Sequence, residues 1–300
     1  MVRTPPPSHS ATSPPPLEDW RVLLDLALAE DIGRGDLTTE LVLDADRRCR
    51  ARIEARADLV VCGLPVARAV FARVDPTLEL HAVEGVDEGR RVDAGCPLLR
   101  VEGRAASILT AERTALNFLG RLCGIATQTR QLADRVHDLD VDLVDTRKTT
   151  PGWRVLEKYA VAVGGGVNHR VGLFDAVLVK DNHIAAAGGL DEAVRRVLAK
   201  APEGVAVQVE VESEAMADRA VALGCRFLLL DNMDSATIAR IVRRHGDEVL
   251  LEASGGIGPE RLREVAGTGV ARISMGALTH SVACADVALE IDFDGAQTDP

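Results

Sequence analysis

The chain has few aromatic residues, a net negative charge and no long apolar run. Only 3% of its 300 residues are Phe, Trp or Tyr, so it offers few surfaces on which the bases of single-stranded nucleic acid could stack. Its formal charge is −11, from 35 Lys and Arg against 46 Asp and Glu, which disfavours a polyanionic partner. These features exclude an ordinary nucleic-acid-binding protein, although an acidic chain can still hold a local basic site.

Paired cysteines are also absent. The six cysteines are scattered, with no CxxC motif and therefore no zinc spacing. Scattered single cysteines in a chain of this size are typical of reduced thiols in a cytoplasmic protein. We expect most of them to be small core residues, because the sequence gives none of them an activating neighbour.

No run of about 18 apolar residues occurs, so no membrane-spanning helix is expected. The first 16 residues are rich in Pro, Ser and Thr and contain no apolar segment of the kind found in secretory signals. Such a composition cannot build a core, and it predicts a disordered tail over residues 1–16.

Two patterns follow along the rest of the chain. Up to residue 122, helices are expected from Leu17, over 63–74 and over 110–122, with a β-rich region over 49–101. Two glycines and several polar residues predict a loop over 29–40.

Beyond that point short apolar runs alternate with amphipathic helical patterns. Predicted strands lie at 141–145, 174–181, 205–212, 227–232, 249–254 and 271–276. The spacing is regular, since 21 residues separate Glu210 from Asp231 and Asp231 from Glu252 (231 − 210 and 252 − 231). Strands alternating with helices predict a parallel sheet. Six such units, without a GxGxxG motif after the first strand, favour an α/β barrel over a doubly wound sheet.

The predicted strands end in polar residues, and active sites of such barrels lie at the carboxyl ends of the strands. In VAVQVEVE the valines 207, 209 and 211 share one face, and Gln208, Glu210 and Glu212 share the other. The polar face is expected to point into the barrel mouth. Inward carboxylates need cations or a metal ion.

A basic cluster interrupts the acidic chain. Between Arg147 and His183 there are six Lys and Arg against three Asp and Glu. Guanidinium groups that fork onto carboxylates suit a small, compact polyanion. Without a family motif, His169 and His183 are better explained as hydrogen-bonded core or loop histidines than as site residues.

Two glycine-containing loops indicate a phosphate site. Residues 254–258, SGGIG, follow a strand and lead into a helix expected near Pro259, and 274–276, SMG, follow the next strand. The backbone N–H groups of such loops bind phosphate, and the last two loops of a barrel are its usual phosphate position. A purely structural turn is the alternative.

Eight motifs in order give the chain a family resemblance. They are EDIGRGDLTTE, AERTALNFLGRLCGIAT, DTRKTTPGWRVLEKYAVAVGGGVNHR, LVKDNHI, VEVE, LDNM, EASGGI and ISMGALTHS. Over about Leu17 to Glu290 the chain resembles the quinolinate phosphoribosyltransferases. Cys123, which stands where many relatives have Ser, and the Pro-rich tail are departures that touch no residue assigned to chemistry.

The resemblance implies a type II phosphoribosyltransferase fold: an N-terminal α/β sandwich over 17–122, joined by a C-terminal segment 280–295, and an open, incomplete α/β (TIM-like) barrel over 123–279. It also implies a cytoplasmic homodimer or higher oligomer, in which Arg113 of one subunit completes the neighbour's site. Without the resemblance, Arg113 would be interpreted as a solvated helix residue.

The implied reaction joins quinolinate to phosphoribosyl pyrophosphate with Mg²⁺, and it yields nicotinate mononucleotide, pyrophosphate and CO2 on the route to NAD. Quinolinate would be bound by Arg113, Thr146, Arg147, Lys148, His169, Arg170 and Lys180. The phosphoribosyl group would be bound by Glu210, Asp231, Ser254, Gly255, Gly256, Ser274, Met275 and Gly276. Lys148, Lys180, Glu210 and Asp231 are the implied catalytic residues, and Glu210 and Asp231 the implied metal ligands. The sequence does not choose between Lys148 and Lys180 for the decarboxylation step.

Two other functions stay open at this point. One is a related phosphoribosyltransferase that acts on a different acid, which the complete basic set disfavours. The other is a non-catalytic phosphosugar-binding relative, which would be expected to lack Glu210, Asp231 or Lys180. All three residues are present.

Overall fold

A computed structural model describes residues 13–292, so the predicted tail lies outside the described residues up to position 12. Two compact units divide the chain. The barrel unit contains Gln131–Thr149 and Gly166–His280, and the sandwich unit contains 13–130, 150–165 and 281–292. The domain borders expected at 122/123 and 279/280 stay a prediction; the first of them falls inside helix α4 (Ala105–Asp134).

The barrel unit is built on a six-stranded sheet in the order β6-β11-β10-β9-β8-β7, with every pair parallel. The strands are β6 (Asp142–Val144), β7 (Val177–Val179), β8 (Val207–Val211), β9 (Phe227–Asp231), β10 (Leu250–Ser254) and β11 (Arg272–Ser274). Each lies within a predicted run. In the described part of the chain β6 and β7 do not pair with each other, so this is an open α/β barrel, and the predicted fold class is confirmed.

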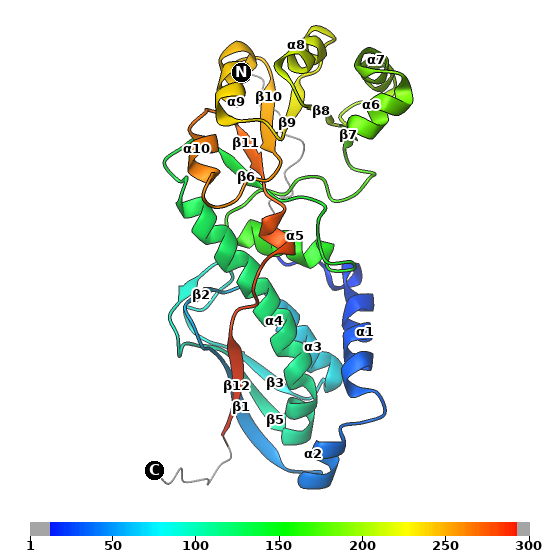
Figure 1. Cartoon of the computed structure of the whole chain (residues 1–300). Coiled ribbons are helices and arrows are strands. Elements are labelled where there is room, and N and C mark those ends of the chain that lie inside the picture. The colour runs from blue at the N-terminus through cyan, green and yellow to red at the C-terminus, as the bar shows by residue number, and fades with distance from the viewer. Residues whose placement is uncertain (1–12, 293–300) are drawn as a thin grey trace. The chain divides into compact units, whose positions relative to one another are not determined.

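Helices connect these strands and flank the sheet (Figure 1). They are α6 (Asp181–Ala187), α7 (Leu190–Lys200), α8 (Glu214–Ala222), α9 (Ser235–His245), α10 (Leu262–Ala266) and α11 (Ala277–His280). Their starts follow from local chemistry: Ser213 and Asp234 accept the first backbone N–H groups of α8 and α9. From β7 to β11 the helices return the chain to the next parallel strand, which gathers the strand ends at one edge of the sheet.

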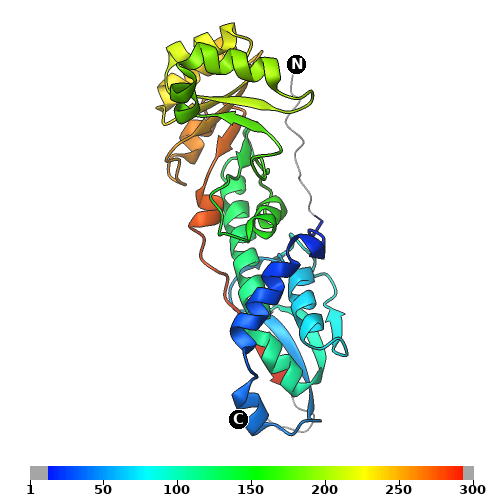
Figure 2. The same cartoon turned by 90° about the vertical axis from the view of Figure 1, so that its right-hand side faces the viewer.

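The sandwich unit contains a four-stranded antiparallel sheet in the order β12-β1-β5-β3 and a pair formed by β2 and β4. Its strands are β1 (Arg48–Ala55), β2 (Leu59–Val60), β3 (Glu79–Ala82), β4 (Arg91–Val92), β5 (Pro97–Arg104) and β12 (Val287–Asp292). Strand β12 pairs with β1 and lies beside it in Figure 1, and Figure 2 shows from another side the red chain that leads into it. Along β1 exposed arginines alternate with buried residues such as Ala51 and Ile53, as expected for a sheet with one buried face.

Helices cover this unit: η1 (Leu17–Asp19), α1 (Arg21–Ile32), α2 (Leu37–Val42), α3 (Leu64–Val74), α5 (Arg154–Val163) and most of α4. Two details of the prediction are wrong. The expected loop over 29–40 contains the end of α1 and the start of α2, because Asp36 accepts the Thr39 N–H at 3.0 Å and caps a new helix. The helix expected over 110–122 is α4, which begins earlier and ends later.

The cysteines are free thiols, and Cys49, Cys62, Cys123 and Cys225 are buried. Burial raises the pKa of the Cys123 thiol to about 12, so this group is not a nucleophile at neutral pH. No helix in the described part of the chain is long and apolar enough to cross a bilayer.

Candidate active site

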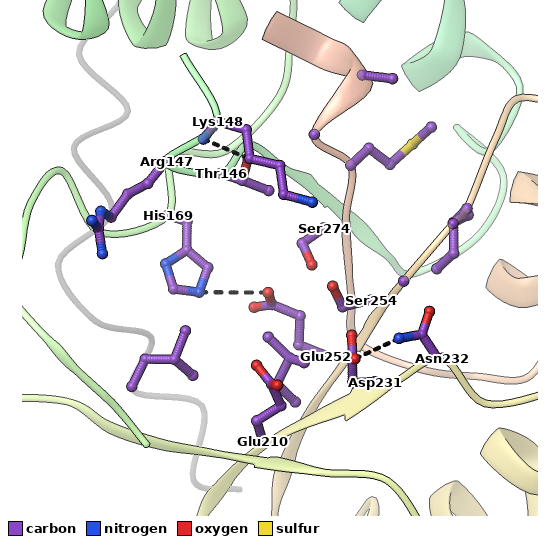
Figure 3. Close-up of a pocket in the computed structure, with 18 of the residues that line it drawn as sticks. Thr146, Arg147, Lys148, His169, Glu210, Asp231, Asn232, Glu252, Ser254 and Ser274 are labelled. Carbon is purple, nitrogen blue, oxygen red and sulfur yellow. Dashed lines mark hydrogen bonds and ion pairs between the residues drawn. The ribbon is translucent and has the colours of Figure 1, made fainter. Parts of the chain in front are cut away.

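A cavity of about 840 Å³ opens at the carboxyl ends of the barrel strands (Figure 3). Fourteen of the predicted site residues line it: Thr146, Arg147, Lys148, His169, Arg170, Lys180, Glu210, Asp231, Ser254, Gly255, Gly256, Ser274, Met275 and Gly276. Arg113, the remaining one, is an exposed residue of α4 and is not among the lining residues. One cavity therefore collects the predicted cations and carboxylates from positions up to 84 residues apart (231 − 147).

A buried carboxylate explains why the two basic segments lie together. Asp145, at the end of β6, is fully buried and accepts the backbone N–H of His169 at 2.7 Å and the Asn168 side-chain amide at 2.8 Å. Val167 also pairs in parallel with Val144. The loop that carries Arg147 and the segment that carries Arg170 are thus clamped side by side, although more than 20 residues separate them.

The Lys148 loop is held at both of its ends. The Thr279 hydroxyl donates to the Lys148 carbonyl at 2.8 Å, and the Lys148 N–H donates to the Thr146 hydroxyl at 3.1 Å. A Cβ on Gly276 would lie 3.1 Å from Cδ of Lys148 and 2.9 Å from the His280 ring. The absence of a side chain at Gly276 therefore gives Lys148 its path into the cavity.

The guanidinium groups of this cluster are poorly compensated. Nε of Arg147 is buried and makes no hydrogen bond within the described residues. Burial lowers the pKa of Arg170, the charge of Arg147 lowers it further, and Asp175 opposes both. Two neighbouring cations with so little compensation form a site for an anion.

His169 contacts the interior of the barrel. Its Nε2 lies 2.9 Å from Oε1 of Gln208 and 3.5 Å from Oε1 of Glu252, while its Nδ1 accepts the Arg170 backbone N–H at 2.7 Å. Figure 3 shows the ring and the Glu252 carboxylate facing each other from different elements. The other histidine of the basic segment, His183, accepts the Lys180 N–H through Nδ1 at 3.0 Å at the start of α6, which is a capping role.

Opposite the basic loop lie the carboxylates of β8 and β9 (Figure 3). Glu210 is 8% exposed, and its Oε2 lies 3.3 Å from Nζ of Lys180. Burial raises the pKa of Glu210; Lys180 opposes this shift, and the charges of Asp231 and Asp181 add to it. The prediction that Glu212 also points into the mouth is wrong: Glu212 lies beyond the end of β8, is exposed, and lines a separate 230 Å³ pocket.

The candidate phosphate loops sit at the ends of β10 and β11. Gly255 (φ +94°) packs against Asn232, so that a Cβ there would lie 2.2 Å from Oδ1 of Asn232. Asn232 itself adopts a left-handed conformation (φ 54°) and donates to Oδ2 of Asp231 at 2.6 Å. The loop after β10 does not lead directly into a helix at Pro259, because α10 begins at Leu262. Gly255 thus brings the backbone next to Asn232, the residue that donates to the Asp231 carboxylate.

Several lining residues are missing from the predicted site. They are Leu178, Leu229, Asn232, Glu252, Ile257, Gly258, Glu260, Ala277 and His280. Glu252 was detectable in principle, because it lies one 21-residue repeat after Asp231 and the register places it beside Leu229, which in turn pairs with Glu210. Asn232 directly follows Asp231, and His280 lies four positions after Gly276. Neither has a sequence pattern that would mark it as a site residue.

The oxygen and nitrogen donors of the cavity decide whether it fits the expected Mg²⁺. Among the described residues no group of three His, Cys, Asp or Glu side chains is arranged to hold a metal. Glu210 and Asp231 nevertheless share the cavity and interact electrostatically. Two carboxylates fit Mg²⁺, which commonly uses one or two protein ligands and takes its other oxygens from water and substrate phosphates.

Comparison with known proteins gives consistent matches over nearly the whole chain. The family model for the N-terminal domain of quinolinate phosphoribosyl transferase matches residues 36–123, and that for the C-terminal domain matches residues 125–290. A probable nicotinate-nucleotide pyrophosphorylase (carboxylating) of Synechocystis is 42% identical over 89% of this chain and 92% of its own. Its Bacillus subtilis counterpart is 39% identical over 90% and 92%. A Francisella tularensis nicotinate-nucleotide pyrophosphorylase structure superposes with a TM-score of 0.89, at 36% identity over 94% of this chain and 99% of its own.

Proposed function

The chain belongs to the quinolinate phosphoribosyltransferase family, and on that premise we propose that it converts quinolinate and phosphoribosyl pyrophosphate into nicotinate mononucleotide, pyrophosphate and CO2, a step of NAD biosynthesis. The observation that carries the proposal is the cavity itself. It is lined by four cations, Arg147, Lys148, Arg170 and Lys180, and by two carboxylates, Glu210 and Asp231. Arg147 and Arg170 are poorly compensated, while Lys180 contacts Glu210.

The cationic side suits quinolinate, whose two adjacent ring carboxylates make it a compact dianion. Arg147 and Arg170 can each fork onto a carboxylate, and Lys148 and Lys180 act as point charges. Thr146 adds a hydroxyl at the same rim. Each charge-assisted hydrogen bond contributes about 1.5–3 kcal/mol, so several together account for recognition of a small ligand.

The acidic side suits the ribosyl group. Departure of pyrophosphate leaves positive charge on ribose C1. The carboxylates of Glu210 and Asp231 stabilise that charge and accept hydrogen bonds from the ribose hydroxyls. The backbone of Ser254–Gly256 and Ser274–Gly276 receives the 5′-phosphate. Asn232 holds Asp231 through its 2.6 Å hydrogen bond.

Mg²⁺, when held by Glu210, Asp231 and substrate oxygens, would neutralise the pyrophosphate leaving group. Once the ring nitrogen is ribosylated, the pyridinium accepts the electrons left at C2 when the carboxylate departs as CO2, so no separate decarboxylation cofactor is required. Lys180 or Lys148 then delivers the proton to that carbon.

The direct test is an assay with quinolinate, phosphoribosyl pyrophosphate and Mg²⁺, in which nicotinate mononucleotide and CO2 are measured together. We expect the two products in a one-to-one ratio, with no product from nicotinate. Turnover of nicotinate at a similar rate, or inert quinolinate with folded protein, would refute the proposal. Omitting Mg²⁺ with a chelator should abolish turnover if the metal assignment is correct.

We also propose that the enzyme works as a homodimer or larger assembly in which Arg113 enters the neighbour's cavity. Its support is the exposure of Arg113 on α4 and its absence from the lining of its own barrel cavity. The free thiols are compatible with a reducing compartment such as the cytoplasm.

A complementation experiment tests the shared site. Arg113→Ala and Arg147→Ala proteins are each expected to be nearly inactive. In a mixed dimer one site carries both substitutions and the other carries neither, so activity should return after subunit exchange. Absence of recovery in a sample where mass spectrometry detects mixed dimers would rule out the contribution of Arg113 across subunits.

A further inference from the structure

Glu252 is a fully buried carboxylate in the interior of the barrel unit. Its Oε2 lies 3.4 Å from Nε of Arg272, which is 2% exposed, and its Oε1 lies 3.5 Å from Nε2 of His169. The strand register places Glu252 directly beside Arg272. Neither carboxylate oxygen receives a regular hydrogen bond within the described residues. A buried charge of this kind is retained only where charged neighbours compensate it.

Arg272 is itself confined. Its guanidinium lies over the Phe227 ring, 5.4 Å from the ring centroid, so both the aromatic face and Glu252 fix its direction. Arg272 is not among the residues that line the cavity. Of the two residues, Glu252 alone lines the cavity. Glu252 is also the member of the pair that contacts His169.

The hydrogen bonds of His169 determine its tautomer. The Arg170 backbone N–H can only donate, so Nδ1, 2.7 Å away, must present its lone pair. The ring proton then lies on Nε2, where Gln208 Oε1 accepts it at 2.9 Å and the Glu252 carboxylate attracts it. Protonation of Nδ1 would set two N–H groups against each other at this contact.

We propose that Glu252, supported by Arg272, is a positioning residue that keeps the ring proton of His169 on Nε2, so that Nδ1 stays an acceptor and orients the Arg170 main chain. This inference rests on the proposed function for its kinetic consequences. His169 acts indirectly, by fixing the direction of the Arg170 backbone next to the Asp145 clamp.

Nitrogen-15 NMR of histidine-labelled protein tests the tautomer without any assay of activity. The His169 resonances are identified by their loss in His169→Gln. We expect the two-bond proton–nitrogen pattern of an Nε2–H imidazole at pH 7.5. A doubly protonated ring, or an Nδ1–H pattern, would overturn the proposal.

Paired substitutions test the role of Glu252. Glu252→Gln alone leaves Arg272 buried without its partner and can fail to fold, so the informative protein is Glu252→Gln with Arg272→Met, which keeps the volume and removes both charges. We expect the His169 pattern to change to a mixture of tautomers and the KM for quinolinate to rise about tenfold. The KM for phosphoribosyl pyrophosphate should change less than about twofold, since no ribose or phosphate ligand is touched.

The control removes a carboxylate–guanidinium pair of the sandwich unit, Asp75→Asn with Arg104→Met, in which Asp75 is buried and Arg104 is exposed. This protein should lose stability but keep the wild-type KM for quinolinate. An unchanged quinolinate KM and an unchanged tautomer in the barrel variant would reduce Glu252 to a packing residue and overturn the inference. If wild-type protein fails to use quinolinate, the proposed function fails, whereas the NMR result still decides the tautomer.

Discussion

The two units treat their buried charges differently. In the sandwich unit, Asp75 accepts hydrogen bonds from Thr77, Ser107 and Arg104, and the Thr77 and Ser107 hydroxyls lead the contacts that hold its pKa well below its usual range. Glu88 likewise accepts from the Gly63 and Leu64 backbone at 2.8 Å and from the Tyr159 hydroxyl at 2.5 Å. Each of these carboxylates stabilises the fold.

In the barrel unit the groups that face the cavity lack such compensation. Burial raises the pKa of Glu210 and lowers the pKa of Arg170. The Nε of Arg147 has no hydrogen bond within the described residues. Poorly compensated charges that line a cavity are typical of a ligand-binding site. The contrast thus identifies the barrel unit as the one whose charged groups serve binding at the expense of the free energy of unfolding.

The largest effect is expected for Glu210→Gln. The amide cannot stabilise the developing ribosyl charge, so kcat should fall on the order of 10²–10³-fold. The raised pKa means that the folded state holds this proton more tightly than the unfolded chain, so ionised Glu210 opposes folding at pH values above its pKa. Thermal unfolding at pH 7.5 should therefore show a higher Tm for the variant, and a lower Tm would contradict the comparison.

Arg147→Ala should raise the KM for quinolinate about ten- to hundredfold, because one charge-assisted pair to the dianion is lost. Since Nε of Arg147 makes no hydrogen bond in the unliganded fold, Tm should stay close to that of the wild type. Steady-state kinetics and differential scanning fluorimetry measure both. Arg195→Ala, on the exposed side of α7, is the control and should change neither.

Asp75→Asn should have the opposite profile. Losing the buried acceptor should lower the free energy of unfolding by about 1–3 kcal/mol at pH 7, while kcat and KM stay unchanged. Because the folded-state pKa is depressed, this stabilisation is present above the usual carboxyl pKa and is lost as the pH falls through the folded value. Urea unfolding of both proteins at pH 7 and pH 3 should show their stabilities converging in acid.

The smallest effect is expected for Glu192→Gln on α7, which removes an exposed ion pair with Arg196, four residues along the helix. Solvent screens such pairs strongly. The Tm should move by no more than about 1 °C in low salt, and kinetics should be unaffected. A shift of several degrees would mean that surface charges in the barrel unit contribute as much as the buried ones in the sandwich unit.

The strands of the barrel could be predicted because buried parallel strands appear as short apolar runs, and because the 21-residue repeat places Glu210 and Asp231 at equivalent strand ends. The role of Glu252 could not be predicted in this way. It depends on contact with His169, 83 positions earlier (252 − 169), and no local pattern encodes such a contact.

Helix α4 shows the same limit in the sandwich unit. Gly124, just past the predicted end at 122, resembles a helix breaker, but the helix continues through it. A Cβ on Gly120 would lie 2.9 Å from the Ala285 carbonyl oxygen, and one on Gly124 would lie 2.2 Å from that of Ala283. Both glycines are required because the segment around Ala283–Ala285 passes directly over α4. The sequence around the helix gives no indication of that contact.

The hydrogen bonds of Asp145 fix the relative positions of two basic segments of the cavity. One carboxylate grips both the loop of Arg147 and the backbone before Arg170, so the separation of the two guanidinium groups is a property of the fold and not of flexible side chains alone. Within the proposed function, that separation selects for ring carboxylates on neighbouring carbons. Isomeric pyridine dicarboxylates carry the same charge at a different spacing. Within the proposed function, we therefore expect Asp145 to contribute to discrimination between these isomers, although it does not contact the substrate.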